Sequence, residues 1–448
     1  MILTSQKDLD LFRDIAENRD EWRTFIAEIR RGAAEAVRQT MERITLKGTD
    51  LKVSPICLGT WQFNDSAQTI TSTWPPQTAE DSKAIVDKCL ELGINFFDTA
   101  EAYDNSEKVL GKALEGRRQD VVVASKFGFR KGSETSPYSA QQIDEAITRS
   151  LINLQTNYLD ILQIHYPRFV KDTNETIAEL ERQKSLGRIR YYGLSNYGPK
   201  NIKKFMEAGG KPVVNQIGYN LLWRSPEHAM IPDSRKYGIN LLAYSPLQQG
   251  LLTGKFSQLS NVPEGRRRGK LFSKDSTPLA IHGQDGCEKE VDEALKKLSE
   301  ICKSANIPMS TAALSWILQQ DGIEVAIVGA SSPQQIVENC KIVQLQNDVL
   351  RQMTEATEAV KQKALKKLSE ICKSANIPMS TAALSWMLQQ GDIQVVIVGA
   401  SSPQQIVENC KIVQLQNDVL GQMTEATEAV KQKVGLSLDQ WSPIDSFE

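Results

Sequence analysis

The sequence lacks the features of secreted, membrane-spanning and zinc-binding proteins. Its apolar stretches all fall short of the ~18 residues that a transmembrane helix requires, and residues 1–10 contain no apolar signal-peptide core. Seven cysteines are present, an odd number, and no two of them form a CxxC pair. This spacing predicts neither a disulfide framework nor a zinc site. We therefore expect a cytoplasmic protein that holds no metal and does not associate with a membrane.

An excess of charge of either sign is also missing. The 53 basic residues are balanced by 55 acidic ones, which leaves a net charge of −2. This balance gives no argument for nucleic acid or an anionic membrane as a partner. The only dense basic run is Arg266-Arg267-Arg268, which is either a solvated loop or a flap that helps to hold a cofactor phosphate. The sequence does not indicate an oligomeric state.

Eight short apolar runs alternate with helical patterns and indicate the fold class. A G-x-G-x-x-G motif after the first run is missing, which counts against a Rossmann nucleotide site. Eight strand–helix units favour a closed (β/α)8 TIM barrel of the α/β class over an open doubly wound sheet. A small hairpin over 44–53 is expected to precede the barrel. The predicted strands are 56–59, 95–98, 121–126, 159–165, 191–195, 213–216, 241–244 and 325–329.

An internal duplication complicates the end of the chain. Residues 294–363 recur as 364–433, and only six positions differ between the copies. Each copy is predicted to contain an α-β-α segment, and two copies are too few for a solenoid. A closed barrel has room for one copy; we expect the first, which follows the seventh strand directly, although exchange between the copies remains open. The predicted divisions are an N-terminal helical extension (1–43), the barrel (44–363), a duplicate packed outside or serving as alternative closure (364–434), and a tail (435–448).

Four ionisable side chains lie at or just beyond predicted strand ends: Asp98, Tyr103, Lys126 and His165. In a parallel barrel these ends open on one face, where chemistry is housed. Singly, each has a plain structural explanation, such as a strand-end cap, a surface aromatic or a packed histidine. Together they predict a proton-donating site. A phenol has a pKa near ~10, and an adjacent ammonium favours the phenolate, so Lys126 is expected to lower the pKa of Tyr103.

Short motifs accompany these four residues along the whole barrel region. They are Leu58-Gly59-Thr60-Trp61, Phe97-Asp98-Thr99-Ala100-Glu101-Ala102-Tyr103, Ala124-Ser125-Lys126, Ile164-His165, Gly193-Leu194-Ser195-Asn196, Asn215-Gln216, Tyr244-Ser245-Pro246-Leu247, Gly250-Leu251-Leu252-Thr253-Gly254-Lys255 and Gly329-Ala330-Ser331-Ser332-Pro333-Gln334-Gln335. In combination they resemble the aldo-keto reductase superfamily over residues 44–363. The bacterial-type and channel-β-like branch is the most similar.

The resemblance implies an NAD(P)H-dependent oxidoreductase that reduces an aldehyde or ketone to an alcohol. Tyr103 would be the general acid, Asp98 would hold Lys126 charged and in place, and His165 would orient the substrate oxygen. A small-molecule carbonyl compound would be the partner. The alternative is an NADPH-binding regulatory or channel-associated barrel subunit with little turnover.

The resemblance also implies where a dinucleotide would bind. Ser195, Asn196 and Gln216 would hold the nicotinamide carboxamide, and Tyr244 would stack on the ring. NADPH is the expected cofactor and NADH is possible, because no Arg or Lys lies near Ser332 to pair with a 2′-phosphate. The remaining predicted cofactor residues are Thr60, Trp61, Ser245, Pro246, Leu247, Gly250, Lys255, Gly329, Ser331, Gln335, Glu338 and Asn339. The second copy repeats the last part of this set as Ser401, Gln405, Glu408 and Asn409.

Three tryptophans, Trp61, Trp74 and Trp223, are the expected walls of the substrate pocket. Aromatic walls suit flat or apolar carbonyl compounds. Trp74 lies in a Pro-rich stretch, where a purely structural role explains it equally well.

Overall fold

The computed structural model describes residues 42–64, 77–128, 137–227, 229–256, 258–283 and 285–361. Several predictions concern residues outside these ranges. They are nearly all of the N-terminal extension, Trp74, the second copy of the repeat, and the tail.

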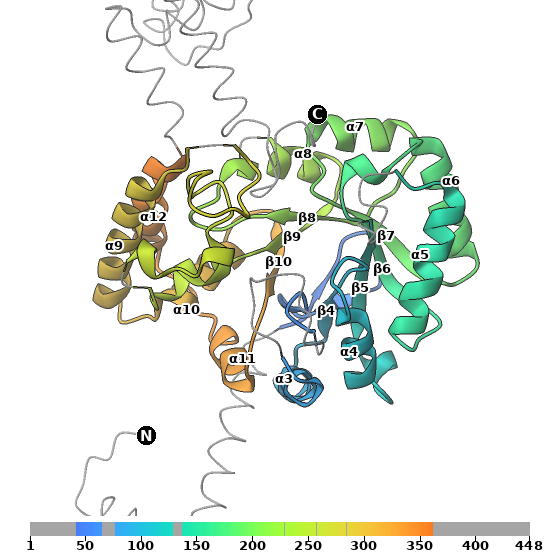
Figure 1. Ribbon diagram of the computed structural model, residues 1–448, viewed down its shortest axis with the longest axis horizontal. Coiled ribbons are helices and arrows are strands. Elements are labelled where there is room, and N and C mark those ends of the chain that lie inside the picture. Colours follow the sequence, from blue (N-terminus) through green and yellow to red (C-terminus); the bar gives the residue numbers. More distant parts are fainter. Residues whose placement is uncertain are drawn as a thin grey trace, which may run out of the picture.

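The described residues form a closed barrel of eight parallel strands, which confirms the predicted (β/α)8 class (Figure 1). The strands are rich in branched apolar residues and are buried on both faces, as expected where helices cover the outside and side chains fill the inside. In barrel order the strands are β10 (Ile323–Val328), β3 (Ile56–Gly59), β4 (Phe96–Asp98), β5 (Val122–Phe127), β6 (Leu159–Ile164), β7 (Ile189–Ser195), β8 (Val214–Gly218) and β9 (Asn240–Tyr244).

Helices surround the strands on the outside of the barrel (Figure 1). Local sequence fixes several of their starts. Ser139 and Gln142 form a reciprocal capping box at α5, and the Thr78 hydroxyl accepts from the Asp81 amide at α3. The helices are α3 (Ala79–Glu91), α4 (Ser106–Ala113), α5 (Ala140–Asn153), α6 (Thr173–Ser185), α7 (Pro199–Glu207), α8 (Met230–Lys236), α9 (Glu288–Ser304), α10 (Met309–Leu318), α11 (Pro333–Asn339) and α12 (Asn347–Ala356).

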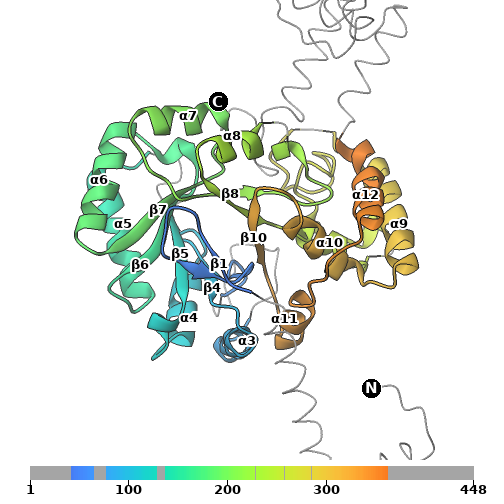
Figure 2. The same cartoon turned by 180° about the vertical axis from the view of Figure 1, so that it is seen from behind.

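The expected hairpin covers the N-terminal end of the barrel. Strands β1 (Ile44–Thr45) and β2 (Lys52–Val53) pair antiparallel and lie across the barrel strands when the molecule is seen from behind (Figure 2). Leu46, Leu51 and Val53 are buried against the inner apolar residues of the barrel. The Asn240 side chain pins the hairpin by accepting from the Lys47 amide at 2.9 Å and donating to its carbonyl at 3.1 Å. The hairpin therefore forms the floor of the barrel.

The first copy of the repeat supplies the strand that closes the barrel. Strand β10 pairs with β3 on one side and with β9 on the other. The expected single helix before this strand is wrong, because the structure has two, α9 and α10. The break falls at Asn306, whose φ of 52° is left-handed, and at Pro308, which precedes the first residue of α10. The division of the chain into extension, barrel, duplicate and tail stays a prediction.

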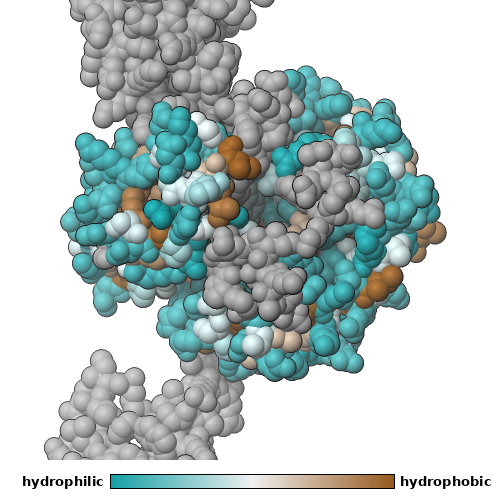
Figure 3. Space-filling model, viewed as in Figure 1, coloured by the Kyte–Doolittle hydropathy of each residue, from teal (hydrophilic) through white to brown (hydrophobic). Residues whose placement is uncertain are grey.

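The described surface is mainly hydrophilic in the view of Figure 3. Its most exposed large apolar side chains are Ile152, Ile281 and Leu186, at 70%, 65% and 55%. In the described ranges, none of the helices combines the length and the apolar character that crossing a membrane demands.

Candidate active site

The four predicted ionisable residues come together at the C-terminal ends of the strands. The Lys126 ammonium lies 2.6 Å from Asp98 Oδ2, 2.9 Å from the Thr99 carbonyl and 3.5 Å from the Tyr103 hydroxyl. The ring of His165 stands edge-on to the ring of Tyr103, with centroids 5.9 Å apart. A phenol, an ammonium, a carboxylate and an imidazole thus share one end of the barrel.

Strand register explains this convergence. Asp98 ends β4 and pairs with Ala124 of β5, while Lys126 lies two residues further along the same strand. His165 directly follows β6, and its amide donates to the Phe127 carbonyl at 3.1 Å. Tyr103 lies in the turn before α4. Residues spaced by two on adjacent parallel strands point to the same side, which here is the barrel interior.

Lys126 and Asp98 form an ion pair that is almost completely buried, with side-chain exposures of 0% and 3%. Burial alone would lower the pKa of the Lys126 ammonium, but the charge and hydrogen bond of Asp98, together with the smaller contribution of Tyr103, outweigh it and raise the pKa. Lys126 therefore stays protonated at neutral pH. A buried pair of this kind persists only where further hydrogen bonds satisfy both partners.

The expected direction of the Tyr103 shift is wrong for this structure. Burial raises the pKa of the Tyr103 phenol, and the attraction of Lys126 is partly cancelled by the nearby Asp98 carboxylate. Burial also lowers the pKa of His165 well below its usual value, and the charges of Lys126 and Arg168 add to this effect. At neutral pH the site therefore holds a protonated phenol, an ammonium and a neutral imidazole.

The predicted carboxamide-binding residues form a connected group on β7, β8 and β9. Asn196 adopts a left-handed φ of 60°, and its side-chain NH2 donates to the His165 carbonyl at 3.1 Å. The Tyr244 hydroxyl donates to Asn196 Oδ1 at 3.0 Å. The Ser195 hydroxyl lies 3.2 Å from the Gln216 carbonyl, and Gln216 Nε2 donates to Asp98 Oδ1 at 2.8 Å. The predicted cofactor residues are therefore hydrogen-bonded directly to Asp98, one of the four predicted catalytic residues.

The loop after β9 has an unusual backbone conformation. Left-handed φ values of 51°, 45° and 52° occur at Ser245, Gln248 and Gln249. Gly250 follows with a φ of 94°, and a Cβ atom there would lie 2.9 Å from Nζ of Lys255. Burial lowers the pKa of Lys255, and the Arg266 charge adds to this. Such a run of left-handed residues is costly and typical of ligand-binding loops. Pro246 and Leu247 belong to the same loop.

The last of the predicted cofactor residues, Gly329 to Asn339, lie in the loop after β10 and on α11. Ser332 caps this helix by accepting from the Gln335 amide, as the Ser-Ser-Pro sequence predicts. The Ser331 amide donates to Gln335 Oε1 at 2.9 Å, and Glu338 is paired with Lys341 at 2.8 Å. Gly329 lies beside the Gln62 side chain, and Asn339 is buried.

The remaining predicted residues differ in their surroundings. The Trp61 ring lies 6.3 Å from the Tyr103 ring and 5.0 Å from the Arg268 guanidinium, so the basic run reaches the site. The Thr60 hydroxyl bonds to the Asp98 carbonyl and to Ser106 inside the barrel wall. Trp223 is 7% exposed and packs in the apolar core. The roles assigned to these residues stay predictions.

Two buried amides at the site escaped the sequence analysis. Gln163 of β6 donates to Asp98 Oδ1 at 3.3 Å, and Asn220 donates to the Ser245 carbonyl at 3.0 Å. Asn220 thereby ties the loop after β8 to the loop after β9. The available signal was a glutamine two residues before His165 in a mostly apolar strand, since a polar residue in a buried strand needs a partner.

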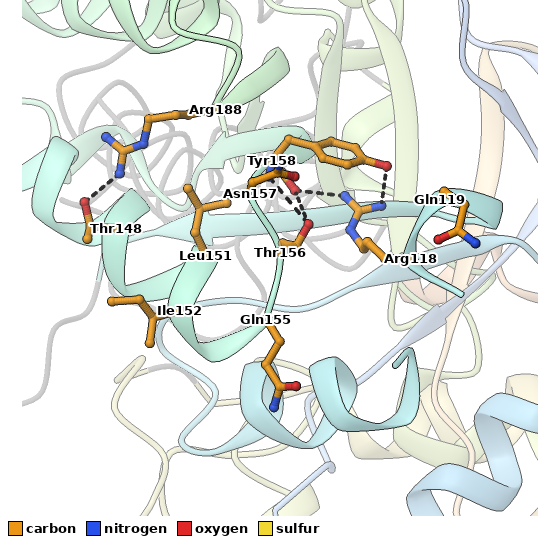
Figure 4. Close-up of a pocket in the computed structure, with 10 residues that line it drawn as sticks. All are labelled: Arg118, Gln119, Thr148, Leu151, Ile152, Gln155, Thr156, Asn157, Tyr158 and Arg188. Atoms are coloured by element: carbon orange, nitrogen blue, oxygen red, sulfur yellow. Dashed lines mark hydrogen bonds between the residues drawn. The ribbon is translucent and has the colours of Figure 1, made fainter. Parts of the chain in front are cut away.

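A hollow of about 630 Å³ lies elsewhere, at the N-terminal side of β5, β6 and β7 (Figure 4). Its two arginines are occupied: Arg118 donates to Asp160 at 2.8 Å, and Arg188 donates to Thr148 at 2.6 Å. In barrel enzymes this end serves stability rather than chemistry. The hollow therefore does not compete with the mouth of the barrel as an active site.

Comparison with known proteins agrees with this geometry. The family model described as "Aldo/keto reductase family" matches residues 55–358 and again residues 355–428. The chain therefore belongs to the aldo-keto reductase family of oxidoreductases.

Individual relatives refine the picture. The chain is 32% identical over 344 residues to the NADH-specific methylglyoxal reductase of Escherichia coli, covering 71% of this chain and 100% of that one. It is also 32% identical over 308 residues to a putative voltage-gated potassium channel subunit beta of Schizosaccharomyces pombe, covering 66% and 86%. An aldo-keto reductase of Bacillus halodurans in its holo form superposes with a TM-score of 0.56 at 29% identity, covering 70% and 96%.

Proposed function

We propose that this protein reduces an aldehyde or ketone to an alcohol with a nicotinamide dinucleotide and with Tyr103 as the general acid. The observation that carries the proposal is the Tyr103 hydroxyl 3.5 Å from a buried Lys126 ammonium that Asp98 holds in place. We infer that the reaction takes place in the cytoplasm.

The protonation state of each residue determines its proposed role in the reaction. The bound dinucleotide supplies the hydride that reduces the carbonyl carbon. Tyr103 donates its proton to the carbonyl oxygen, and the positive charge of Lys126 stabilises the phenolate that remains. Asp98 keeps the ammonium charged and aimed. His165 is neutral, so its imidazole can orient the substrate oxygen without a competing positive charge.

The residues present fit a nicotinamide carboxamide. Ser195, Asn196 and Gln216 bring a hydroxyl and two amides together, and Tyr244 lies beside Gly218, where a Cβ atom would lie 3.1 Å from Cζ of the tyrosine. The left-handed loop after Tyr244 and the nearby Lys255 suit a pyrophosphate. Both NADH and NADPH are candidates. The Escherichia coli relative is named as NADH-specific, whereas Arg266 and Arg268 beside the site favour an extra phosphate.

The test is steady-state oxidation of NADH and NADPH with a panel of carbonyl compounds that includes methylglyoxal. Tyr103→Phe should lower kcat by about a hundredfold or more, since a positioned acid contributes 10²–10⁴-fold. Dinucleotide affinity, followed by quenching of tryptophan fluorescence, should change little. A Tyr103→Phe variant that keeps the wild-type rate contradicts the acid assignment.

The similarity to the channel subunit supports a second candidate, a regulatory barrel that binds NADPH and turns over slowly. The burial that raises the pKa of Tyr103 also fits slow proton donation. Tight dinucleotide binding without turnover across the panel would favour this candidate. Turnover that depends on Tyr103 would favour the reductase.

A further inference from the structure

Gln163 is a buried amide that neither the tetrad nor the predicted cofactor set includes. Its side chain is 0% exposed inside the barrel, on β6 between Lys126 of β5 and Gly193 of β7. Gly193 has no side chain, and a Cβ atom there would lie 3.5 Å from Cγ of Gln163 and 2.3 Å from Val214. Gln163 therefore packs against the glycine backbone of the neighbouring strand, and the tight approach at this position is to Val214.

The bonds of Gln163 close a triangle with Asp98 and Gln216. Nε2 of Gln163 donates to Asp98 Oδ1 at 3.3 Å, and Nε2 of Gln216 donates to the same oxygen at 2.8 Å. The second hydrogen on Gln216 Nε2 points to Gln163 Oε1 at 3.4 Å. An ionised carboxylate only accepts, so both amides must present their NH2 groups to it, which fixes their orientation.

In this arrangement the two oxygens of the Asp98 carboxylate accept from different partners. Oδ1 takes the neutral amide donors, and Oδ2 takes the Lys126 ammonium. With Oδ1 occupied, the carboxylate cannot turn to grip the ammonium with both oxygens. Lys126 therefore stays within reach of the Tyr103 hydroxyl. Amide donors also spread the charge of Asp98, whose field opposes release of the proton from Tyr103.

We propose that Gln163 is a positioning residue of the proton-donating site, which acts through Asp98 to keep Lys126 directed at Tyr103. This proposal rests on the proposed function. The ionisable groups facing Asp98 are Lys126 from β5, Tyr103 from the turn after β4, and Cys57 from β3. Within the described residues, β7 and β8 present Gly193 and Gln216 here, which do not titrate.

Two variants separate positioning from packing. Gln163→Met keeps the length of the side chain and removes its hydrogen bonds, so the single-turnover rate of carbonyl reduction should fall about tenfold. Dinucleotide affinity should stay within about threefold of the wild-type value, since the substitution leaves the predicted carboxamide-binding residues Ser195, Asn196 and Gln216 in place. Single-turnover rates are needed because product release can mask the chemical step.

Gln163→Glu gives a pH signature that a packing role would not produce. A second carboxyl beside Asp98 has a raised pKa, because two like charges share the site. While protonated it donates to Asp98 and replaces the amide, so the rate at low pH should approach that of the wild type. As pH rises through this pKa, the donor is lost and a repulsive charge appears. The variant should therefore lose activity at a lower pH than the wild type.

Gln183→Met is the matched control. Gln183 is also a completely buried glutamine bonded to carboxylates, Asp144 and Glu179, but it lies on α6 outside the barrel. Its loss should lower stability without changing the pH profile of reduction.

The outcomes separate the two proposals. A wild-type protein that binds dinucleotide but reduces nothing overturns the proposed function. An active wild type with an unchanged rate and pH profile in Gln163→Met overturns only the role of Gln163. If Gln163→Met does not fold, the pH dependence of the reduction rate of Gln163→Glu is the test. A pH–rate profile with the same shape as that of the wild type would contradict the positioning role.

Discussion

At the scale of single residues, two buried histidines make stability depend on pH. His165 is 7% exposed and His282 is 5% exposed, and burial lowers the pKa of His282 to about 4 and that of His165 well below its usual value. The positive charge of Lys126 adds to the shift at His165, and that of Lys270 to the shift at His282. Both imidazoles are therefore neutral in the folded protein at neutral pH.

The free energy of unfolding should fall as pH falls from 6.5 towards 5. In this window the unfolded histidines bind protons and the folded ones do not, so each contributes at most about 1.4 kcal/mol per pH unit. His282→Gln should reduce this slope, while the other titrating groups contribute equally in both proteins. Urea unfolding at several pH values provides the measurement. Equal slopes for wild type and variant would show that His282 does not titrate in this way.

The sequence predicted the positions of the site residues better than their states. Strand ends placed Asp98, Lys126 and His165 on one face, and the structure brings them together there. The direction of the Tyr103 pKa was missed because burial depends on residues far apart in the sequence. Gln163 was missed for the same reason, since its partners Asp98 and Gln216 are distant along the chain.

At the scale of elements, apolar runs located all eight strands close to their observed bounds. The starts of α3 and α5 were also readable, because capping depends on neighbours three residues apart. The split between α9 and α10 was missed, although Asn306 and Pro308 mark it in the sequence. The left-handed loop after β9 could not be predicted in detail, because Ser245 and Gln249 adopt strained conformations that tertiary contacts impose.

Strand β7 offers a test of how tightly the elements are packed. A methyl group at Gly193 would lie 2.3 Å from Val214 Cγ2 and 3.0 Å from the Val214 carbonyl oxygen of the neighbouring strand. Gly193→Ala should therefore destabilise the protein by about 1–3 kcal/mol. Adding Val214→Ala removes the first clash and should restore part of the loss in the double variant. Thermal unfolding of the four proteins checks this; additive losses would contradict the steric explanation.

At the scale of the whole molecule, the few differences between the two copies bear on which copy closes the barrel. In the first copy, Gly322 has a φ of 92°, and a Cβ atom there would lie 2.8 Å from Arg235 Nε. Asp321 pairs with the same arginine, and Ala326 is completely buried in β10. The second copy carries Gly391, Asp392 and Val396 at the corresponding positions. Its residues therefore fit the observed position less well.

A chimaeric barrel tests this directly. Introducing Asp321→Gly, Gly322→Asp and Ala326→Val together should lower stability by about 2–4 kcal/mol, from strain at a left-handed residue and overpacking of a full core. Asp321→Gly alone should cost well under 1 kcal/mol, because the ion pair is exposed. Chemical denaturation should be measured in the chain with residues 364–433 deleted, because the second copy then cannot replace the first. Stability equal to the parent would mean that the copies are interchangeable.

The hairpin that forms the floor has a consequence for how protons move. Among the described residues, Leu46, Leu51 and Val53 fill the N-terminal end of the barrel with buried apolar side chains, whereas the Lys126–Asp98 pair lies at the opposite end. A dinucleotide bound at that end would separate the Tyr103 hydroxyl from bulk water during the reaction. Tyr103 would then regain its proton from solvent only after the cofactor or the product dissociates.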